Sequence, residues 1–521
     1  MVAGILDHQW PQTAPAILDR AARLWPDRPA LSCSTSGISL TWSELRNEVE
    51  DLAERLVGAG IKQGATVAVA SEITGDLVVL AHAVLRSGAV LAPLNLQFTP
   101  TETARYIDTL RREFDVVCVS SRHYTDMFSK TDVDKRYCFG DVLIGDWQPI
   151  ASLRERAPLT REILPSDPSY AIATSGSTSF PKATLGTQRG LAHFGSSLVD
   201  NVGLVETDRY LNVLPMFHLG GISMALSMVP LSGAELNLLP RFDARAAIEA
   251  IRANQITATT AWDGFFDMMA QAEGFTDDVF STVKKCVIAG RSHYYNKLVG
   301  WGIERVVTFY GMTEGHMVTV LQADELDEDM RTTTSGRATL GTEVVVVDPE
   351  TDEAVAEGGI GEIRYRGPGL FKHYIGEPEM TKESFDRHGF FKSGDMGYFK
   401  GSNLVLVGRY KFMVKTGGEN VSEVEVEEAI LAHFPEIVNV AVVGAPDDKY
   451  GEIVYAFVEW RGAQKLDLDQ VRGRLRGEIA NFKMPRSLAE IQPSSWPQTA
   501  SGKVNKLKLR AMAAAQVSTE K

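Results

Sequence analysis

The chain has 521 residues, 44% hydrophobic and 23% charged, which is typical of a globular protein with more than one domain. A net charge of −14 without any basic block argues against a nucleic-acid or anionic-membrane surface. Residues 1–11 lack the pattern of a signal peptide, and the most apolar stretch, 67–94, carries three charged side chains, so we expect no membrane span. Four widely spaced cysteines favour buried thiols in a cytoplasmic protein.

The first 120 residues alternate between helical and strand-like patterns. Thr41-Trp42-Ser43-Glu44 has the spacing of a capping box, and apolar residues then recur at helical intervals as far as Gly58. A second helix is capped at Thr99, with proline at its first turn. The other segments are strands at 66–70, 90–92 and 115–119 and a helix at 77–86. This alternation predicts an α/β fold with a largely parallel sheet.

A hydroxyl-rich run follows a short buried strand at residues 170–173. The run reads Thr174-Ser175-Gly176-Ser177-Thr178-Ser179-Phe180-Pro181-Lys182. Its hydroxyl groups, its glycine and its terminal ammonium group together suit a polyphosphate. It is not the Walker pattern, because no Gly-Lys-Ser/Thr follows four residues after the first glycine. Alone, such a run is more often an exposed loop, and the phosphate interpretation depends on the motifs further along the chain.

The α/β alternation resumes after this run, and its character changes twice. Segments with regular patterns are a helix from about Ala244, strands near 256–260 and 285–289, a strand-rich region at 341–408, a helix at 424–433, and strands at 438–443 and 453–460. The strand-rich region predicts a smaller sheet or barrel, and the last hundred residues predict a separate α+β unit.

Three motifs place polar side chains beside glycines. Leu214-Pro215-Met216-Phe217-His218-Leu219-Gly220-Gly221 puts an imidazole next to two glycines that allow close backbone approach. Tyr310-Gly311-Met312-Thr313-Glu314 follows a strand, and a carboxylate at a sheet end suits a magnesium ion that carries substrate phosphates. Ser393-Gly394-Asp395 places a carboxylate after a tight turn, which suits ribose hydroxyl groups. Alone, the first motif is equally compatible with a buried turn, the second is compatible with a solvated loop, and the third is more often a surface turn.

Two further motifs lie between residues 408 and 503, and the first of them consists of two runs. Gly408-Arg409-Tyr410-Lys411 and Lys415-Thr416-Gly417-Gly418-Glu419-Asn420 flank the change in pattern and are typical of a linker that also carries chemistry. Pro497-Gln498-Thr499-Ala500-Ser501-Gly502-Lys503 ends in a lysine on a flexible loop, which by itself is most often a solvated charge.

Taken together and in this order, the six motifs resemble the adenylate-forming superfamily of acyl- and aryl-CoA synthetases, peptide-synthetase adenylation domains and beetle luciferases. The resemblance runs from about Thr41 to Leu509. It implies a large amino-terminal domain of two α/β subdomains plus a β-barrel, which we place at residues 1–408, and a small mobile α+β domain at 409–521. It also implies ATP or AMP, Mg²⁺ and coenzyme A as cofactors. A carboxylate would attack ATP to give an acyl-adenylate, and after domain rotation a thiol would displace AMP.

The resemblance assigns roles residue by residue. Candidate catalytic residues are Lys503, Thr313, Glu314, His218 and Lys411, with Lys503 bridging the carboxylate and the α-phosphate, Glu314 holding magnesium and Lys411 acting as the hinge. Candidate nucleotide contacts are Thr174, Ser175, Gly176, Ser177, Thr178 and Lys182 at the phosphates, Gly290, Arg291, Tyr310 and Gly311 near adenine, and Asp395 and Arg409 at the ribose. Candidate coenzyme A contacts are Lys415, Gly417, Gly418 and Glu419, and the acyl pocket would include His218, Gly220, Trp262 and Gly264.

Four positions depart from the family pattern, which usually reads Thr-Gly-x-Pro-Lys-Gly in the phosphate loop. Ser179 and Ala183 replace the two glycines, and added Cβ atoms restrict positive φ angles and close approach to phosphates. The adenine-side loop, commonly Gly-Gly-Ala, ends in Arg291, and the aspartate that usually follows the hinge is Phe412. One hypothesis is that adenylation is impaired and that a partner enzyme supplies the acyl-adenylate. The alternative is ordinary drift with full ligase activity.

The predicted activity is therefore that of an acyl-CoA ligase for a bulky hydrophobic acid. An enzyme that performs only thioester formation, or one that loads a carrier protein, remains an alternative. A non-catalytic nucleotide-binding regulator is a further alternative, against which the retained Lys182 and Lys503 argue. Phe217, Phe265 and Phe266 favour a bulky apolar acid, although such residues are as often part of a core, and Asp263 leaves amino acids open.

Overall fold

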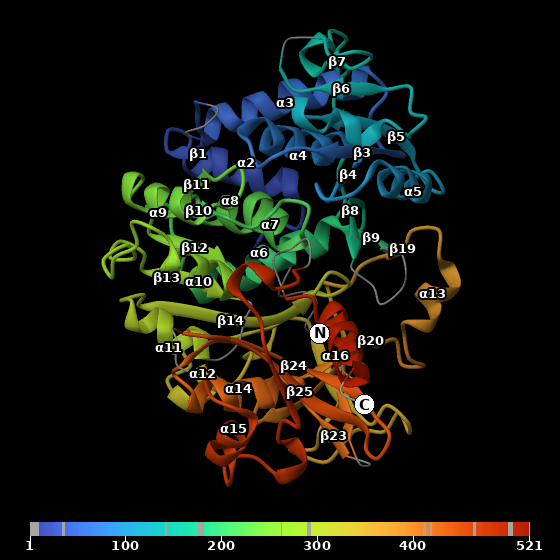
Figure 1. Cartoon of the computed structure of the whole chain (residues 1–521). Coiled ribbons are helices and arrows are strands. Elements are labelled where there is room, and N and C mark those ends of the chain that lie inside the picture. Colours follow the sequence, from blue (N-terminus) through green and yellow to red (C-terminus); the bar gives the residue numbers. More distant parts are fainter. Residues whose placement is uncertain are drawn as a thin grey trace. The chain divides into compact units, whose positions relative to one another are not determined.

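The computed structural model describes residues 10–33, 37–140, 143–174, 182–261, 263–288, 293–409, 413–416, 419–461, 465–498 and 504–519 (Figure 1). The chain divides into two compact units, the first formed by Met1–Val344 and Tyr365–Phe391 and the second by Val345–Arg364 and Lys392–Lys521. The predicted boundary after residue 408 stays a prediction. Within the described ranges, no helix has both the length and the apolar composition needed to cross a bilayer. All four cysteines are buried, as expected.

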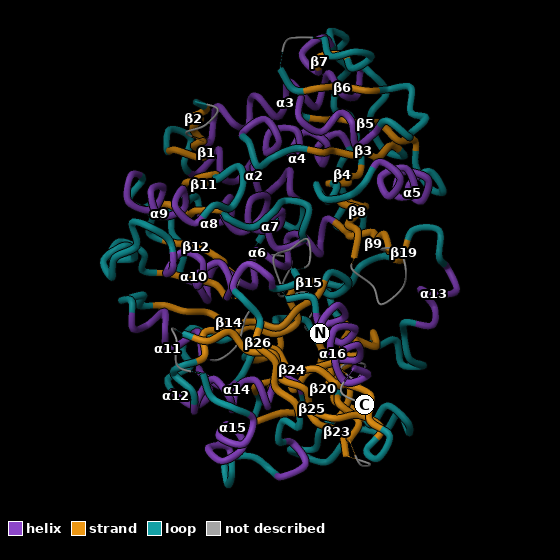
Figure 2. The backbone as a smooth tube through the Cα atoms, viewed as in Figure 1, coloured by secondary structure: helices purple, strands orange, loops and turns teal. Residues whose placement is uncertain are grey.

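One sheet of the first unit carries the predicted phosphate loop. Its strands, in spatial order, are β19 (His373–Tyr374), β9 (Lys182–Thr187), β8 (Pro168–Thr174), β4 (Val90–Pro93), β3 (Ala65–Ala70), β5 (Asp115–Ser120), β6 (Arg136–Cys138) and β7 (Gln148–Pro149). The strands from β8 to β7 are parallel neighbours, as predicted. In contrast, β9, which lies between β8 and β19 (Figure 2), pairs antiparallel with both of them.

The other sheet of the first unit contains the second set of predicted strands. Its order is β16 (Arg337–Ala338), β15 (His316–Val320), β14 (Arg305–Met312), β13 (Lys285–Ile288), β12 (Ala258–Ala261), β10 (Arg209–Asn212), β11 (Glu235–Leu238), β1 (Pro29–Cys33) and β2 (Ile38–Thr41). Its centre, from β14 to β1, is parallel. Both edges are antiparallel, with β15 and β16 on one side and β2 on the other.

Two helices begin where the sequence predicts capping boxes. Helix α3 (Trp42–Gly58) starts with the Glu44 amide donating to the Thr41 hydroxyl group at 3.2 Å, while the Glu44 carboxylate accepts from the Thr41 amide at 2.8 Å. Helix α5 (Pro100–Leu110) starts with the same reciprocal bonds between Thr99 and Glu102. Each box satisfies two backbone groups that a helix end otherwise leaves exposed. Both predictions are confirmed.

The first unit contains further helices. They are α2 (Ala14–Leu24), α4 (Gly75–Ser87), η1 (Arg122–Phe128), η2 (Ile150–Ser152), α6 (Gln188–Val202), α7 (Leu219–Ser223), the π-helical turn η3 (Met224–Met228), α8 (Val229–Ser232), α9 (Ala244–Ala253), α10 (Asp263–Gln271), α11 (His293–Gly300), α12 (Glu328–Thr333) and α13 (Pro378–Glu383). Helix α4 contacts β4 of one sheet and β1 of the other. Its side chains are mostly buried, and they belong to the main apolar core.

The second unit contains a four-stranded and a five-stranded sheet. The first has the order β17 (Glu343–Val347), β18 (Gly361–Arg366), β20 (Phe391–Lys400) and β21 (Asn403–Arg409), and the predicted β-barrel stays a prediction. The other has the order β23 (Glu419–Val421), β22 (Val414–Thr416), β25 (Gly451–Trp460) and β24 (Ile437–Asp447), with β26 (Ser487–Glu490) beside β25. Its helices are α14 (Glu423–His433), α15 (Leu468–Leu475), η5 (Asn481–Lys483), η6 (Pro493–Ser495) and α16 (Lys506–Thr519).

Candidate functional site

The hairpin between β14 and β15 carries the predicted adenine and magnesium residues. Tyr310 and Gly311 were expected to follow the strand, but they lie within β14, which continues to Met312 because it pairs antiparallel with β15 beyond Phe309. A Cβ atom at Gly311 would lie 2.0 Å from the His316 carbonyl oxygen, so this close approach requires glycine. Thr313 and Glu314 therefore lie at the tip of a hairpin.

Glu314 is held from two sides by one segment of chain. Its side chain is nearly buried, and its carboxylate oxygen Oε1 accepts a hydrogen bond of 2.8 Å from the Tyr374 hydroxyl group. Its backbone carbonyl accepts a bond of 2.8 Å from the Phe371 amide. Lys182 also reaches Tyr374, with its ammonium nitrogen 4.8 Å from the centre of the ring. The structure thus brings Lys182 and Glu314 to the same tyrosine.

The two ends of the predicted phosphate loop are paired. Thr174 ends β8, Lys182 begins β9, and their Cα atoms are partners across this antiparallel pair. The Thr174 hydroxyl group donates to the Lys182 carbonyl at 3.4 Å. Lys182 is therefore a strand residue, where the sequence placed it in a turn. Other predicted site residues lie outside the described ranges: Ser175, Gly176, Ser177, Thr178, Trp262, Gly290, Arg291, Lys411, Gly417, Gly418 and Lys503.

A buried histidine lies just beyond Glu314. His316 has a positive φ of 55°, an unusual conformation for a residue with a side chain, and its ring contacts Tyr170 and Gly369. Because the Gly369 carbonyl can only accept, Nδ1 carries the proton and Nε2 accepts from the Tyr170 hydroxyl group at 2.5 Å. Burial lowers the pKa of His316 to about 3, so the ring is neutral. This bond joins β8 to the hairpin of Glu314.

The predicted acyl-pocket residues are only partly brought together. His218 ends a turn before α7, and its ring centre lies 4.7 Å from that of Phe217. A Cβ atom at Gly264 would meet no heavy atom of the described residues within 4 Å. Phe265 and Phe266, expected as pocket candidates, are buried in the core: Phe265 stacks on Phe242 at 4.0 Å, and Phe266 packs against Phe280 and Trp301. The apolar face of α10 turns these rings inward.

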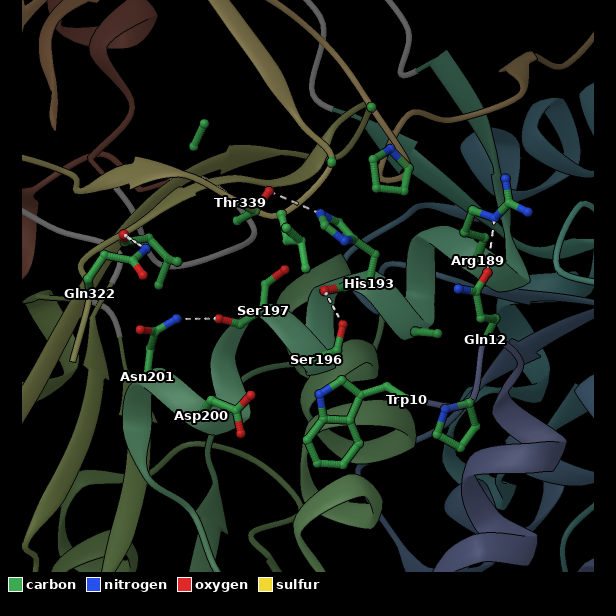
Figure 3. Close-up of a pocket in the computed structure, with 18 residues that line it drawn as sticks. Trp10, Gln12, Arg189, His193, Ser196, Ser197, Asp200, Asn201, Gln322 and Thr339 are labelled. Carbon is green, nitrogen blue, oxygen red and sulfur yellow. Dashed lines mark hydrogen bonds between the residues drawn. The ribbon is translucent and has the colours of Figure 1, made fainter. Parts of the chain in front are cut away.

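A cavity of about 760 Å³ opens elsewhere in the first unit, along α6 (Figure 3). Its labelled polar lining includes Arg189, His193 and Asp200, and the His193 ring is bonded to the Thr339 hydroxyl group at 3.0 Å. Trp10 and Gln12 close one side. None of the residues that the sequence predicts for the nucleotide, acid or thiol belongs to this lining.

The second unit brings the two predicted ribose residues together. Asp395 and Arg409 are partners across β20 and β21, and the Arg409 Nε donates to the nearly buried Asp395 carboxylate at 2.8 Å. Asp395 was expected after a tight turn, yet Ser393, Gly394 and Asp395 all lie inside β20, where Gly394 has a φ of +70°. Lys415 lies in β22, and its amide donates to the Glu452 carboxylate at 2.8 Å. Glu419 begins β23, the strand that pairs with β22.

Comparison with known proteins identifies the family. The model of the AMP-binding enzyme family matches residues 18–375, and that of the AMP-binding enzyme C-terminal domain matches residues 425–503. The chain belongs to the adenylate-forming superfamily. The predictions of this family, of the α/β fold with a large and a small domain, and of an acid–thiol ligase are confirmed.

Individual relatives match almost end to end. A probable CoA ligase of Humulus lupulus is 30% identical over 98% of both chains. The indoleacetate–CoA ligase of Aromatoleum aromaticum is 29% identical over 95% of this chain and 97% of its own. The ATP-bound MatB structure from Rhodopseudomonas palustris superposes with a TM-score of 0.83 and 27% identity, covering 96% of this chain and 99% of that one.

The described residues fit a magnesium ion carried by a nucleotide. Magnesium is usually bound by one or two carboxylates together with substrate phosphates, and Glu314 offers a carboxylate whose orientation a buried tyrosine fixes. Among the described residues, no group of three or more histidine, cysteine or acidic side chains could hold a metal by itself. Tyr374, Tyr170 and His316 could not be predicted as site residues, because none of them lies in a motif and their contacts join distant segments.

Proposed function

We propose that the chain is an acyl-CoA ligase that converts a bulky hydrophobic carboxylic acid into its CoA thioester through an acyl-adenylate. The observation that carries this proposal is the meeting of Lys182 and Glu314 at Tyr374, within a chain that matches CoA ligases almost end to end. An ammonium group and a carboxylate at one point suit a magnesium-bound polyphosphate. We place this activity in the cytoplasm.

Each half-reaction has its own set of proposed residues. For adenylation, Lys182 would neutralise phosphate charge, Glu314 would hold the magnesium ion that accompanies ATP, and Lys503 would stabilise charge that grows on the α-phosphate. Asp395 would accept hydrogen bonds from the ribose, with Arg409 keeping its carboxylate in place. For thioester formation, rotation about Lys411 would bring Gly417 and Gly418 to the site, where the absence of side chains admits the pantetheine arm.

The departures in the phosphate loop favour full ligase activity more than the sequence alone suggests. Ala183 replaces a glycine, yet its side chain is 2% exposed and packs in the core beside Ala171 and Leu185. A methyl group that points into the core does not narrow the space for phosphates. Lys182 keeps its place through strand pairing. The thioesterification-only enzyme is the second candidate, supported by Ser179, Arg291 and Phe412.

The relatives and the turn near His218 support a proposal for the class of acid. One relative is named for indoleacetate, a bulky aromatic acid. The Phe217 and His218 rings lie together at the start of α7, in the region proposed for the acyl pocket. We therefore propose aromatic or alicyclic acids as the substrate class.

Two parallel reactions test the proposal across a panel of bulky acids. One contains acid, ATP, magnesium and CoA, and the other contains the synthetic acyl-adenylate and CoA, with the thioester detected by mass spectrometry. Thioester in both reactions is the expected result. Thioester from the adenylate alone would favour the thioesterification-only enzyme with a partner adenylating enzyme. Loading of a phosphopantetheinyl carrier in preference to CoA would favour the carrier-loading alternative, and tight AMP binding without any product would indicate a regulator.

A further inference from the structure

We propose that Tyr374 is a positioning residue for the magnesium-dependent half-reaction: its hydroxyl group orients the Glu314 carboxylate, and its ring positions the Lys182 ammonium group. This inference rests on the proposed function, because it concerns the same nucleotide site. It goes beyond that function by naming the side chain that sets the relative position of the two charged groups.

The Tyr374 hydroxyl group forms a hydrogen bond with the Glu314 carboxylate. Tyr374 is 3% exposed and Glu314 is 7% exposed, and the phenol hydroxyl group donates to Oε1 at 2.8 Å. The terminal torsion of a glutamate side chain is broad, so a carboxylate that nothing holds rotates freely. A buried donor on one oxygen fixes the plane of the carboxylate and thereby the direction of the second oxygen. Outer hydrogen bonds of this kind commonly orient the ligands of metal ions.

The Tyr374 ring also contacts the ammonium group of Lys182. The ammonium nitrogen lies 4.8 Å from the centre of the Tyr374 ring, which is within the range of a cation–π interaction. The same side chain therefore addresses an anion through its hydroxyl group and a cation through its ring. A tyrosine suits both tasks, whereas phenylalanine would keep only the second and leucine neither.

Tyr374 is itself held in place by its neighbours. Tyr374 lies in β19 opposite Thr184 of β9, and its amide contacts the Thr381 hydroxyl group at 3.0 Å. Its ring meets that of Phe371 at 4.8 Å in an edge-on arrangement. The Phe371 amide in turn donates to the Glu314 carbonyl at 2.8 Å. One short segment, 371–374, thus fixes both the backbone and the side chain of Glu314.

A separate anchor holds the same hairpin from its other side. The Gly369 carbonyl accepts from the His316 ring, whose second nitrogen accepts from Tyr170 on β8. The backbone of the hairpin is therefore fixed without Tyr374. Removing the Tyr374 hydroxyl group should disturb the carboxylate and leave the fold of the hairpin intact.

The experiment uses Tyr374→Phe, which deletes the hydroxyl group and keeps the ring beside Lys182. We expect the magnesium concentration for half-maximal acyl-adenylate formation to rise by about tenfold, the scale seen when outer-shell partners of metal ligands are removed. Thioester formation from synthetic acyl-adenylate, which needs no metal-bound polyphosphate, should be unchanged. Tyr374→Leu should also raise the KM for ATP, because it removes the ring contact with Lys182.

A matched control is Tyr106→Phe. The Tyr106 hydroxyl group is also buried and donates to a backbone carbonyl, that of Ala171, at 3.1 Å. This variant should lose a similar amount of stability and keep the wild-type magnesium dependence. In a double-mutant cycle, Tyr374→Phe should have no further effect on the magnesium dependence in a Glu314→Gln background.

A binding measurement separates this inference from the proposed function. Calorimetric titration of ATP at several magnesium concentrations needs no acid and no turnover. If the wild type binds ATP with magnesium but makes no product from any acid, the proposed function fails. A higher magnesium concentration for half-maximal ATP binding in Tyr374→Phe would still support the positioning role. A wild-type magnesium dependence in Tyr374→Phe, or additive effects in the cycle, would overturn the inference. Magnesium-independent binding by the wild type would overturn both.

Discussion

The ammonium group of Lys506 lies 2.7 Å from the carboxylate of Glu427, a side chain that is only 1% exposed. Lys506 also lies 2.8 Å from Glu423, and Arg510 contacts Glu423 at 2.7 Å and Glu452 at 3.4 Å. Burial raises the pKa of Glu423, while both cations oppose that shift. The cluster joins the start of α14 to the start of α16 within the second unit.

Lys506→Met should destabilise the second unit. The change leaves two buried carboxylates with one fewer counter-charge, and breaking a buried ion pair typically costs about 3–5 kcal/mol of unfolding free energy. Urea unfolding measured by tryptophan fluorescence would give the difference. Lys508 is exposed on the same helix, and Lys508→Met should change the free energy by less than about 0.5 kcal/mol. Equal losses in the two variants would contradict a role for the cluster.

His82→Leu should reduce the acid sensitivity of the first unit. Burial lowers the pKa of His82 to about 3, and its Nε2 has no hydrogen-bond partner among the described residues. The unfolded chain takes up this proton near pH 6.5. Between pH 6.5 and 3 the unfolded state thus binds more protons than the folded state. The free energy of unfolding therefore decreases by about 1.4 kcal/mol for each unit by which the pH is lowered.

Urea unfolding at pH 7.5 and pH 5.0 would test this expectation. The leucine variant should lose about 2 kcal/mol less than the wild type between these two conditions, because it lacks the group that titrates in the unfolded chain. Parallel losses in both proteins would show that His82 does not contribute.

Asp395→Asn should weaken nucleotide binding in both half-reactions. The amide oxygen can still accept from Arg409, so the β20–β21 pair should remain folded. Loss of the negative charge weakens hydrogen bonds from ribose hydroxyl groups, and we expect the KM for ATP and that for acyl-adenylate to rise by about tenfold each. Steady-state kinetics of the two reactions would measure this. A change confined to ATP would place Asp395 away from the ribose.

The two glycines after His218 should respond differently to alanine. A Cβ atom at Gly221 would lie 2.3 Å from the Pro215 carbonyl oxygen, whereas one at Gly220 would meet the Leu214 side chain at 3.3 Å. Gly221→Ala should therefore cost about 1–3 kcal/mol of unfolding free energy, because backbone atoms must shift. Gly220→Ala should be tolerated. Denaturant unfolding of both variants gives the comparison, and equal values would contradict it.

Gly264→Leu should change acid selectivity without unfolding the chain. Gly264 lies in the first turn of α10, and a Cβ atom there would meet no heavy atom of the described residues within 4 Å. If this space receives the acyl group, kcat/KM for the largest acids should fall by about tenfold relative to small ones. Gly300→Leu, at a glycine with equally open surroundings among the described residues, should leave selectivity unchanged.

Local structure could be predicted from the sequence where a side chain forms a hydrogen bond with the backbone a few residues away. The capping boxes at Thr41 and Thr99 are of this kind, and both helices begin there. Pairing between distant strands has no such local signal. The antiparallel β8–β9 pair and the extension of β14 through Tyr310 were missed for that reason.

Individual site contacts were harder to predict than the elements that carry them. The bond between Glu314 and Tyr374 joins residues 60 positions apart, and no periodicity reports it. The run Ser393-Gly394-Asp395 predicted a tight turn because of its glycine, and Gly394 does adopt a positive φ, yet it lies inside β20. The sequence left Phe265 and Phe266 open between a pocket and a core, because apolar rings suit either, and the structure buries both.

The predicted phosphate motif combines two properties, which are the backbone position of its terminal lysine and the set of hydrogen-bond donors before it. The pairing of Thr174 with Lys182 concerns only the first of these. The register of β8 and β9 places the backbone of Lys182 opposite that of Thr174, and seven positions lie between these two ends. Under the proposed function, exchanging residues at those seven positions should change the hydrogen-bond donors offered to phosphate, and thus nucleotide affinity, in variants that keep the β8–β9 register.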